Sequence, residues 1–278
     1  MPQHPQDEIS QSVLNFYKEL PFNARNSVSA RAAQIRMHDP VRSYPPLRGR
    51  LKRQRILEVG CGVGWFSNGL AFHHNARVTG IDFNPVAIER AEATARALKL
   101  TSRFSVQNLF EYSPPERFSL VVSLGVLHHT SDCEGAVRRI CKHFLDERGT
   151  VVIGLYHTFG RKPFLEHFRT LQKSGASEDE LLKEYGRLHN LSDDATHLRS
   201  WFRDQVLHPH ETQHTYAELR SIIESEGLRI SSTSLNRFNP ITSHEEIEIQ
   251  ELQCEQVSLN AISEGRYYPG FFVVVAER

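Results

Sequence analysis

The alternation of strand-like and helix-like segments between residues 53 and 156 most strongly limits how this chain can fold. The expected strands are RILEV, RVTGI, RFSVQ, FSLVVSL and GTVVIGLY, and the clearest helices between them are PVAIERAEATARALKL and CEGAVRRICKHFL. Because a helix between successive strands lets them run parallel, the pattern predicts an α/β fold with a mainly parallel sheet covered on both faces.

The rest of the chain divides around this alternation. After Tyr156 the strand signal stops and Leu-rich, charged helical segments follow. The chain ends with a further helix, the strand LRISSTSL, a polar segment around residues 239–266 and the strand GFFVVVAE. We therefore expect an N-terminal helical extension (1–50), the core (51–156), a helical insertion over the acceptor site (157–214) and the last helix and two strands of the core (215–278).

The N-terminal extension contains one amphipathic helix, which Pro21 ends. Its apolar face is formed by Ile9, Val13, Phe16 and Leu20. Two interpretations stay open for this helix. It either folds over the site as a lid, with Tyr17 and Phe22 facing it, or packs on the sheet edge.

A glycine-rich turn follows the first expected strand, in ILEVGCGVGWFS. Gly60, Gly62 and Gly64 lack a Cβ, which permits a tight turn and a close approach of backbone N–H groups to a ligand. The acidic residue Glu58 precedes the turn, and Asp82 ends the second strand. The spacing G-x-G-x-G differs from the G-x-G-x-x-G of dinucleotide sites, which weakens a dinucleotide interpretation. Glu58, just before the loop, suits a ligand with a cationic or amine end.

Five sequence blocks in this region resemble the class I S-adenosylmethionine-dependent methyltransferases. They are, in family order, RILEVGCGVGWFS, VTGIDFNPVAIERA, FSVQNLF, FSLVVSLGVLHHTSD and GTVVIGLY. The resemblance implies a Rossmann-like fold with a mainly parallel, seven-stranded sheet and S-adenosylmethionine as cofactor. It also implies in-line transfer of a methyl group to an O, N or S atom of a small molecule.

The resemblance also assigns the cofactor residues. The glycine loop would pack against the methionine part and the ribose, Asp82 would hold the ribose hydroxyls, and His129 would border the sulfonium pocket. Asn108 stands where many relatives carry Asp, but its amide keeps a carbonyl acceptor for adenine. In a purely structural alternative these residues serve only turns and caps. The full set is Glu58, Gly60, Cys61, Gly62, Gly64, Asp82, Phe83, Asn108, Leu109, Leu124, Gly125 and His129.

Residues 210–214, HETQH, match the H-E-x-x-H pattern of zinc peptidases. That chemistry needs both histidines on one helical face. However, Thr215 and Glu218 form a capping-box pair, which predicts that the helix begins only after Thr215. We therefore predict a loop and no metal. The alternatives are a zinc hydrolase using His210, Glu211 and His214, and a looser metal site of Asp204, His208, His210 and His214.

The stretch from Trp201 to Thr215, together with residues 154–161, resembles one found in a subset of these methyltransferases. We expect it to cover the acceptor pocket. Histidine suits proton removal from an acceptor, so His210, His214 and His157 are the candidate bases or orienting groups. The predicted substrate contacts are Tyr17, Tyr156, Trp201, Asp204 and His208. In the alternative interpretation Trp201 anchors the insertion and the histidines only cap helices and bridge loops.

The charge balance limits the classes of partner, and the cysteine content indicates the cellular compartment. The 33 basic residues balance 33 acidic ones, so we expect no nucleic acid or membrane partner. The four cysteines show no CxxC pair and the N-terminus has no apolar leader, which predicts a cytoplasmic protein. A homodimer, RNA or protein methylation, and a cofactor-binding subunit without catalysis are the alternatives left open.

Overall fold

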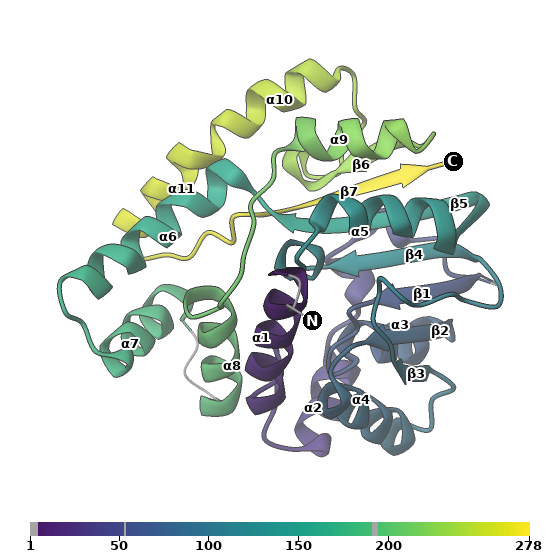
Figure 1. The fold of residues 1–278 in the computed structure, drawn as a ribbon, viewed down its shortest axis with the longest axis horizontal. Helices are drawn as coiled ribbons and strands as arrows, with labels where there is room; N and C mark the ends of the chain where they lie inside the picture. The colour runs from purple at the N-terminus through teal and green to yellow at the C-terminus, as the bar shows by residue number, and fades with distance from the viewer. Residues whose placement is uncertain (1–4, 53, 191–193) are drawn as a thin grey trace.

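A seven-stranded sheet forms the centre of the computed structural model, which describes residues 5–52, 54–190 and 194–278 (Figure 1). The strand order is β3-β2-β1-β4-β5-β7-β6, and β7 runs antiparallel to β5 and β6 whereas the other pairings are parallel. This confirms the expected fold class. The strands are β1 (Arg55–Val59), β2 (Arg77–Asp82), β3 (Arg103–Val106), β4 (Phe118–Leu124), β5 (Leu145–Tyr156), β6 (Arg229–Thr233) and β7 (Phe271–Glu277).

Helices cover both faces of the sheet. Those of the core are α3 (Trp65–His74), α4 (Pro85–Leu98), α5 (Cys133–Arg139) and α9 (Tyr216–Ser225). Short helical turns are η1 (Pro40–Arg42), η2 (Pro45–Leu47), η3 (Leu127–His129), the π-helical η4 (Ile140–Phe144) and η5 (Ser234–Asn236).

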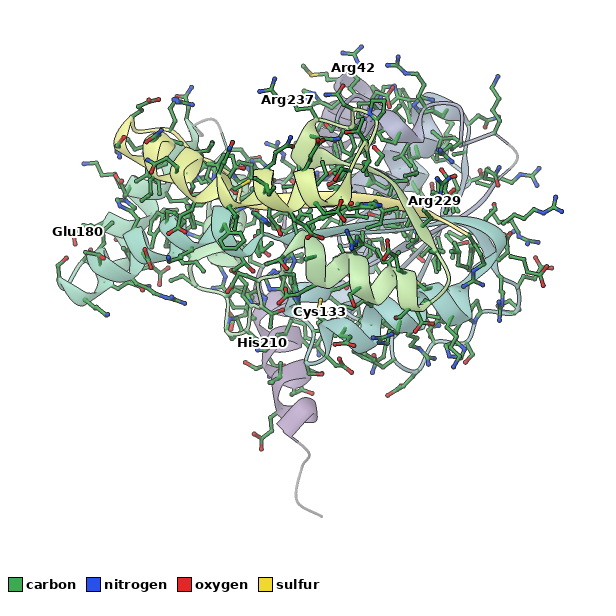
Figure 2. All side chains as sticks on the ribbon, turned by 90° about the horizontal axis from the view of Figure 1, so that it is seen from above. Arg42, Cys133, Glu180, His210, Arg229 and Arg237 are labelled. Atoms are coloured by element: carbon green, nitrogen blue, oxygen red, sulfur yellow. The ribbon has the colours of Figure 1, made fainter. Side chains whose placement is uncertain are left out.

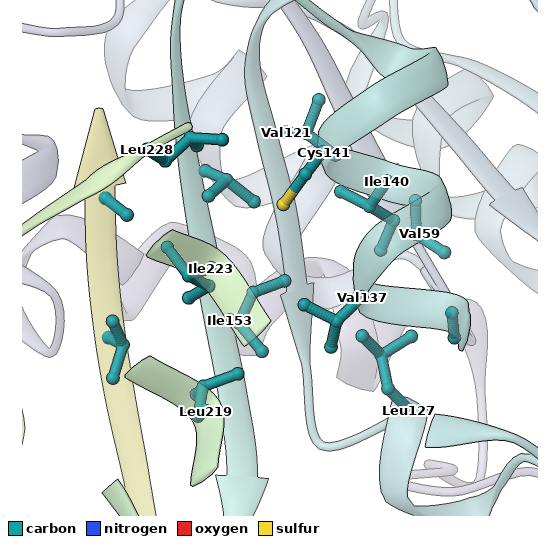
Figure 3. Close-up of a cluster of buried hydrophobic side chains, with 14 of the residues drawn as sticks. Val59, Val121, Leu127, Val137, Ile140, Cys141, Ile153, Leu219, Ile223 and Leu228 are labelled. Carbon is teal, nitrogen blue, oxygen red and sulfur yellow. The ribbon is translucent and has the colours of Figure 1, made fainter. Parts of the chain in front are cut away.

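The central strands are mostly apolar because they are buried on both faces. Val121 of β4 belongs to the apolar cluster under α5 and α9, in which Val137 and Ile223 also lie (Figure 3). The next residue, Val122, belongs to the cluster on the opposite face, which includes Phe66 of α3. A strand buried on both sides has no solvent face for polar residues, so its sequence reads as a continuous apolar run.

The insertion after β5 has an apolar cluster of its own. It comprises α6 (Thr158–Lys173), α7 (Glu178–His189) and α8 (Ala195–Val206). Their buried side chains are Phe164, Phe168, Leu181, Tyr185, Leu188 and Phe202. Because these residues pack mainly on one another, the insertion projects to one side of the sheet (Figure 1).

The polar stretch 239–266 contains two helices that the sequence pattern did not indicate. They are α10 (His244–Leu252) and α11 (Cys254–Ser263), and α11 packs along α6. Helix α10 buries only Ile247 and Glu251, and α11 only Ser258 and Ala261. With so few apolar residues facing inward, neither helix has a clear apolar periodicity.

Two helices form the N-terminal extension, α1 (Pro5–Glu19) and α2 (Val28–Met37). Helix α1 lies between α8 and α2 (Figure 1), and its first turns project from the body of the molecule (Figure 2). None of the helices in the described part of the chain combines the length and the apolar character that a bilayer crossing requires.

The capping box at the start of α9 gives a direct stability test. Thr215 Oγ1 accepts the Glu218 N–H at 3.1 Å, and a Glu218 carboxylate oxygen accepts the Thr215 N–H at 2.8 Å. Thr215→Ala removes one of these bonds and should lower the free energy of unfolding by about 1 kcal/mol in urea titrations. The exposed control Thr101→Ala should change it by less than about 0.5 kcal/mol. Equal effects of both substitutions would contradict the cap.

Candidate active site

The three glycines between β1 and α3 have different surroundings. Their φ angles are positive, +73° at Gly60, +50° at Gly62 and +73° at Gly64, which glycine adopts without strain. A Cβ on Gly60 would lie 2.4 Å from Val126, and one on Gly64 would lie 2.7 Å from Ala91. A Cβ on Gly62 would meet no heavy atom within 4 Å among the described residues. Gly60 and Gly64 therefore pack the loop closely, whereas Gly62 leaves one face open to a ligand.

Asp82 ends β2 beside this loop. Its Oδ2 accepts the Gly62 N–H at 2.8 Å and its Oδ1 accepts the Asn84 N–H at 2.9 Å. Burial raises the pKa of Asp82, and the backbone donors of Asn84, Gly62 and Phe83 act in the opposite direction by stabilising the carboxylate. Because each oxygen has further lone pairs, the same carboxylate can also accept hydrogen bonds from two ligand hydroxyls.

Glu58, Cys61 and Leu109 lie behind the loop. The Glu58 Oε2 accepts the Ser67 N–H at 3.0 Å and also the Ser67 hydroxyl, and burial raises the pKa of Glu58 to about 8. Cys61 packs towards Gly80 in β2, and Leu109 belongs to the apolar cluster under α5. Glu58 therefore supports the first turn of α3, and the Cys61 side chain packs the loop against β2.

The other predicted cofactor residues follow the carboxyl ends of the strands. Phe83 follows β2, and Leu124 and Gly125 lie at the end of β4. Asn108 follows β3 and is exposed, and its Oδ1 accepts the Phe110 N–H at 3.0 Å. The carbonyl that we expected to face adenine thus already caps a turn. The cofactor roles of these residues stay predictions.

Helix α1 connects the loop side of the crevice with the insertion. The Tyr17 carbonyl accepts the Nδ2–H of Asn84 at 2.9 Å, two residues after Asp82. The Tyr17 hydroxyl donates to Asp204 Oδ1 of α8 at 2.5 Å. Tyr17 therefore links the two parts of the site, and the lid role of α1 stays a prediction.

Asp204 is the meeting point of the predicted acceptor residues. Besides Tyr17, the Tyr156 hydroxyl donates to its Oδ2 at 3.2 Å, and His129 Nε2 lies 3.9 Å from its Oδ1. Burial raises the pKa of Asp204, while His208 and the Tyr17 hydrogen bond act in the opposite direction. The structure thus brings together Tyr17, Tyr156, Asp204, His208 and His129.

A buried ion pair that the sequence did not reveal lies beside this cluster. The fully buried Arg161 donates through Nε and Nη2 to both oxygens of Glu211, at 3.0 and 2.8 Å, and through Nη2 to the Gln205 carbonyl at 2.7 Å. Its guanidinium carbon lies 4.0 Å from the Tyr156 ring centroid. Burial lowers the pKa of Arg161, but Tyr156 and Glu211 outweigh it and the net shift is upward.

The two loop histidines bind neighbouring loops. His210 Nε2 lies 3.0 Å from the Thr130 carbonyl oxygen, and His214 Nε2 lies 2.9 Å from the Thr212 hydroxyl. Burial lowers the pKa of His214. The His214 N–H donates to the carbonyl of Tyr156 at 2.9 Å. These contacts favour the interpretation in which both histidines hold the loop together.

His157 is engaged at both ring nitrogens. Its Nδ1 accepts the Gly160 N–H at 3.2 Å and so caps α6, and its Nε2 donates to Glu251 at 2.8 Å. Burial lowers the pKa of His157, but hydrogen bonds with Cys254 and Glu251 outweigh it and raise it. These contacts favour a structural role over that of a base.

Trp201 faces the N-terminal extension. Its ring lies 4.9 Å from that of Phe22, and its Nε1–H donates to Asn23 at 3.5 Å. It therefore fastens the extension to α8, as the alternative interpretation expects. On the other side of the insertion a cleft of about 350 Å³ borders the acceptor cluster. Its lining includes Phe168, Arg169, Gln205, His208, His210 and Glu211.

The H-E-x-x-H stretch is not helical. Residues 210–214 have no helical hydrogen-bonding pattern, and α9 begins only at Tyr216, as the capping box predicts. Glu211 is bound to Arg161. Within residues 5–52, 54–190 and 194–278, no group of three or more His, Cys, Asp or Glu side chains is placed to hold a metal ion. The zinc hydrolase alternative therefore lacks the helix on which it depends.

The sequence model of a family described as a methyltransferase domain matches residues 56–147. This stretch is a class I methyltransferase domain. A ubiquinone biosynthesis O-methyltransferase of Alkalilimnicola ehrlichii is 32% identical over 135 residues, which are 45% of this chain and 52% of that protein. A protein of the same name from Coxiella burnetii is 26% identical over 226 residues, 79% of this chain and 85% of that protein. The chain thus spans about half the length of the first relative.

A solved structure shares the fold across the whole chain. The magnesium protoporphyrin IX methyltransferase of Synechocystis PCC 6803, solved with bound S-adenosylmethionine, is 17% identical with a TM-score of 0.54. The match covers 100% of this chain and 99% of that one. The methyltransferase domain therefore lies within a fold that continues through the insertion and the last strands.

The Arg161–Glu211 pair makes a prediction for stability. Glu211→Ala leaves a buried cation without its partner and should cost about 3–5 kcal/mol in chemical denaturation. The matched double variant Arg161→Met with Glu211→Leu removes both charges and should be less destabilised than Glu211→Ala. A double variant as unstable as the single one would show that packing, and not the unpaired charge, sets the cost.

The same pair predicts how stability changes with pH. Burial raises the pKa of Glu211, but the charge and hydrogen bonds of Arg161 outweigh it, so the net shift is downward. The stabilisation is therefore complete above the ordinary carboxyl pKa of about 4.3 and is lost as the pH falls through the lower folded value. The stability difference between the wild type and Glu211→Gln should shrink below about pH 4. A constant difference down to pH 2 would contradict the shift.

The four cysteines should differ in reactivity. Burial raises the pKa of Cys61, Cys133 and Cys141, whose side chains are buried. Burial also raises the pKa of the half-buried Cys254, but hydrogen bonds with His157 and Tyr268 outweigh it and the net shift is downward. Because the thiolate is the reactive form, iodoacetamide at pH 7.5 should modify Cys254 first, as peptide mass spectrometry would show. First modification at any other cysteine would contradict this order.

Proposed function

We propose that this protein transfers a methyl group from S-adenosylmethionine to an oxygen, nitrogen or sulfur atom of a small molecule. The observation that carries the proposal is the crevice at the carboxyl ends of β1 and β2, where the open face of Gly62 lies beside the carboxylate of Asp82. Ligands of open α/β sheets bind at this edge. The methyltransferase-domain match over residues 56–147 supports the same reaction.

The residues at this edge fit the cofactor. Gly62 has space for a ligand, and Asp82 has free lone pairs for the two ribose hydroxyls. The Nε1–H of Trp65, at the start of α3, is buried and has no hydrogen-bond partner within the described structure. When bound, S-adenosylmethionine supplies an electrophilic methyl group on its sulfonium. The chain itself then has to position the acceptor and exclude water.

The insertion and α1 support a small acceptor over a macromolecular one. Tyr17 closes one side of the site onto Asp204, and the 208–214 segment closes the other. Segments packed over the strand ends in this way favour a compact ligand, whereas RNA or a protein chain needs an open groove. The relatives named as ubiquinone biosynthesis O-methyltransferases favour an oxygen acceptor.

Cofactor binding tests this proposal. The wild type should bind S-adenosylmethionine and S-adenosylhomocysteine in calorimetry. Asp82→Ala should weaken both by about 10- to 150-fold, because hydrogen bonds to a charged group contribute about 1.5–3 kcal/mol.

The control for this experiment is Glu116→Ala, which removes an exposed carboxylate and should bind like the wild type. Thermal unfolding of Asp82→Ala would verify that the variant is folded. Absence of binding by the wild type would refute the proposal. Binding without transfer to any hydroxyl, amine or thiol acceptor would instead support the non-catalytic alternative.

A further inference from the structure

The backbone of His210 holds two neighbouring imidazole rings in opposite tautomers. His129 Nδ1 lies 3.0 Å from the His210 carbonyl oxygen, which can only accept, so this Nδ1 carries the proton. His208 Nδ1 lies 3.1 Å from the His210 backbone N–H, which can only donate, so this Nδ1 is unprotonated. A neutral imidazole has one N–H. The Nε2 of His129 is therefore a lone-pair acceptor, and the Nε2 of His208 is an N–H donor.

Both rings are neutral near pH 7. Burial lowers the pKa of His129 to about 4 and that of His208 to about 3. The charged and titratable groups around them are Tyr17, His128, Tyr156, Arg161, Asp204, His210 and Glu211. At neutral pH the His129 Nε2 is therefore an acceptor and the His208 Nε2 is a donor, because the backbone of His210 fixes both tautomers.

The two free nitrogens lie close together at the centre of the site. The rings of His129 and His208 are 3.7 Å apart between centroids, at 30°. Both Nε2 atoms are buried, and neither has a hydrogen-bond partner in the part of the chain that the structure describes. Buried polar atoms in proteins normally have partners, so these two indicate a bound polar group. The cleft of about 350 Å³ borders His208.

We propose that His129 and His208 together bind the hydroxyl group of the methyl acceptor. This inference rests on the proposed function and narrows its substrate class. A hydroxyl can donate its proton to His129 and accept the Nε2–H of His208 at the same oxygen. A carboxylate has no proton for His129, and an ammonium group has no lone pair for His208. The pair therefore selects against both.

His129 then acts as the proton acceptor. The acceptor O–H bond breaks, the proton moves to His129 Nε2, and the electron pair of the bond stays on the oxygen. The imidazolium that results lies 3.9 Å from the Asp204 carboxylate, which compensates its charge. Tyr17 and Tyr156 donate to the two oxygens of Asp204 and act as positioning residues. Because the pKa of His129 is low, it matches an acidic phenol or enol better than an alcohol.

Nuclear magnetic resonance tests the tautomers directly. Long-range ¹H–¹⁵N spectra of protein labelled at histidine should show the Nδ1–H form for His129 and the Nε2–H form for His208 at pH 7.5. His129→Asn and His208→Asn assign the signals, and an Asn side chain can keep the bond to the His210 backbone. The opposite tautomer at either ring in the wild type would overturn the proposal.

Three probes with one ring and different polar groups test the substrate class. Phenol, benzoate and benzylammonium are added in turn to the wild type with S-adenosylhomocysteine. Phenol should shift the Nε2 signals of both histidines, and the other two should leave them in place at the same concentration. Phenol should lose this effect in His129→Asn and in His208→Asn.

The outcomes separate the two proposals. Shifts caused by benzoate or benzylammonium but not by phenol, or by none of the three, would overturn the hydroxyl assignment. Calorimetry on the same samples measures S-adenosylhomocysteine binding. If the wild type does not bind S-adenosylhomocysteine, the proposed function is refuted. If it binds S-adenosylhomocysteine but phenol does not shift the Nε2 signals, only the present inference is refuted.

Discussion

The extended segment 208–214 ties the insertion to the sheet, and the geometry of the site depends on it. The Thr212 N–H donates to the His128 carbonyl at 2.8 Å, after β4, and the His214 N–H donates to the Tyr156 carbonyl at 2.9 Å, at the end of β5. The Glu211 carboxylate binds Arg161. Because these bonds use the backbone and one buried charge, the position of the segment is fixed even where its side chains are polar.

The fixed position of this segment explains why several groups that lower the stability of the fold lie together. A buried Arg161, a buried Asp204 and the unpartnered Nε2 atoms of His128, His129 and His208 each lower stability unless something compensates. Arg161 is compensated by Glu211 and the ring of Tyr156, and Asp204 by two tyrosine hydroxyls. For the Nε2 atoms of His129 and His208 the described residues provide no such compensation. Binding sites retain uncompensated groups of this kind because a ligand satisfies them.

The features that were predictable from the sequence are those with a local pattern. The apolar runs of β1 to β5 and β7 and the glycine turn between β1 and α3 lie where the pattern places them. So does the start of α9, because Thr215 and Glu218 satisfy each other three residues apart. Each of these depends on neighbours in sequence, so spacing alone is informative.

The remaining features depend on contacts that spacing does not encode. Glu211 binds Arg161 from a position fifty residues away, and nothing at either position marks the pair in advance. His210 attracted attention for its side chain, but its backbone N–H and carbonyl orient the rings of His208 and His129. Backbone groups are the same at every residue, so this role has no sequence signal at all.

Helix α1 joins the predicted cofactor side and the imidazole pair into one site, because its residue Tyr17 contacts both. The Tyr17 carbonyl binds Asn84, beside the residue predicted to hold the cofactor ribose, and the Tyr17 hydroxyl binds Asp204, beside the imidazole pair. Movement of α1 away from the sheet must break both bonds together. The same motion therefore uncovers the cofactor side and removes a hydrogen bond from the carboxylate near His129. In this position of α1 the contact with Asn84 and the contact with Asp204 therefore depend on each other through one side chain and its own backbone.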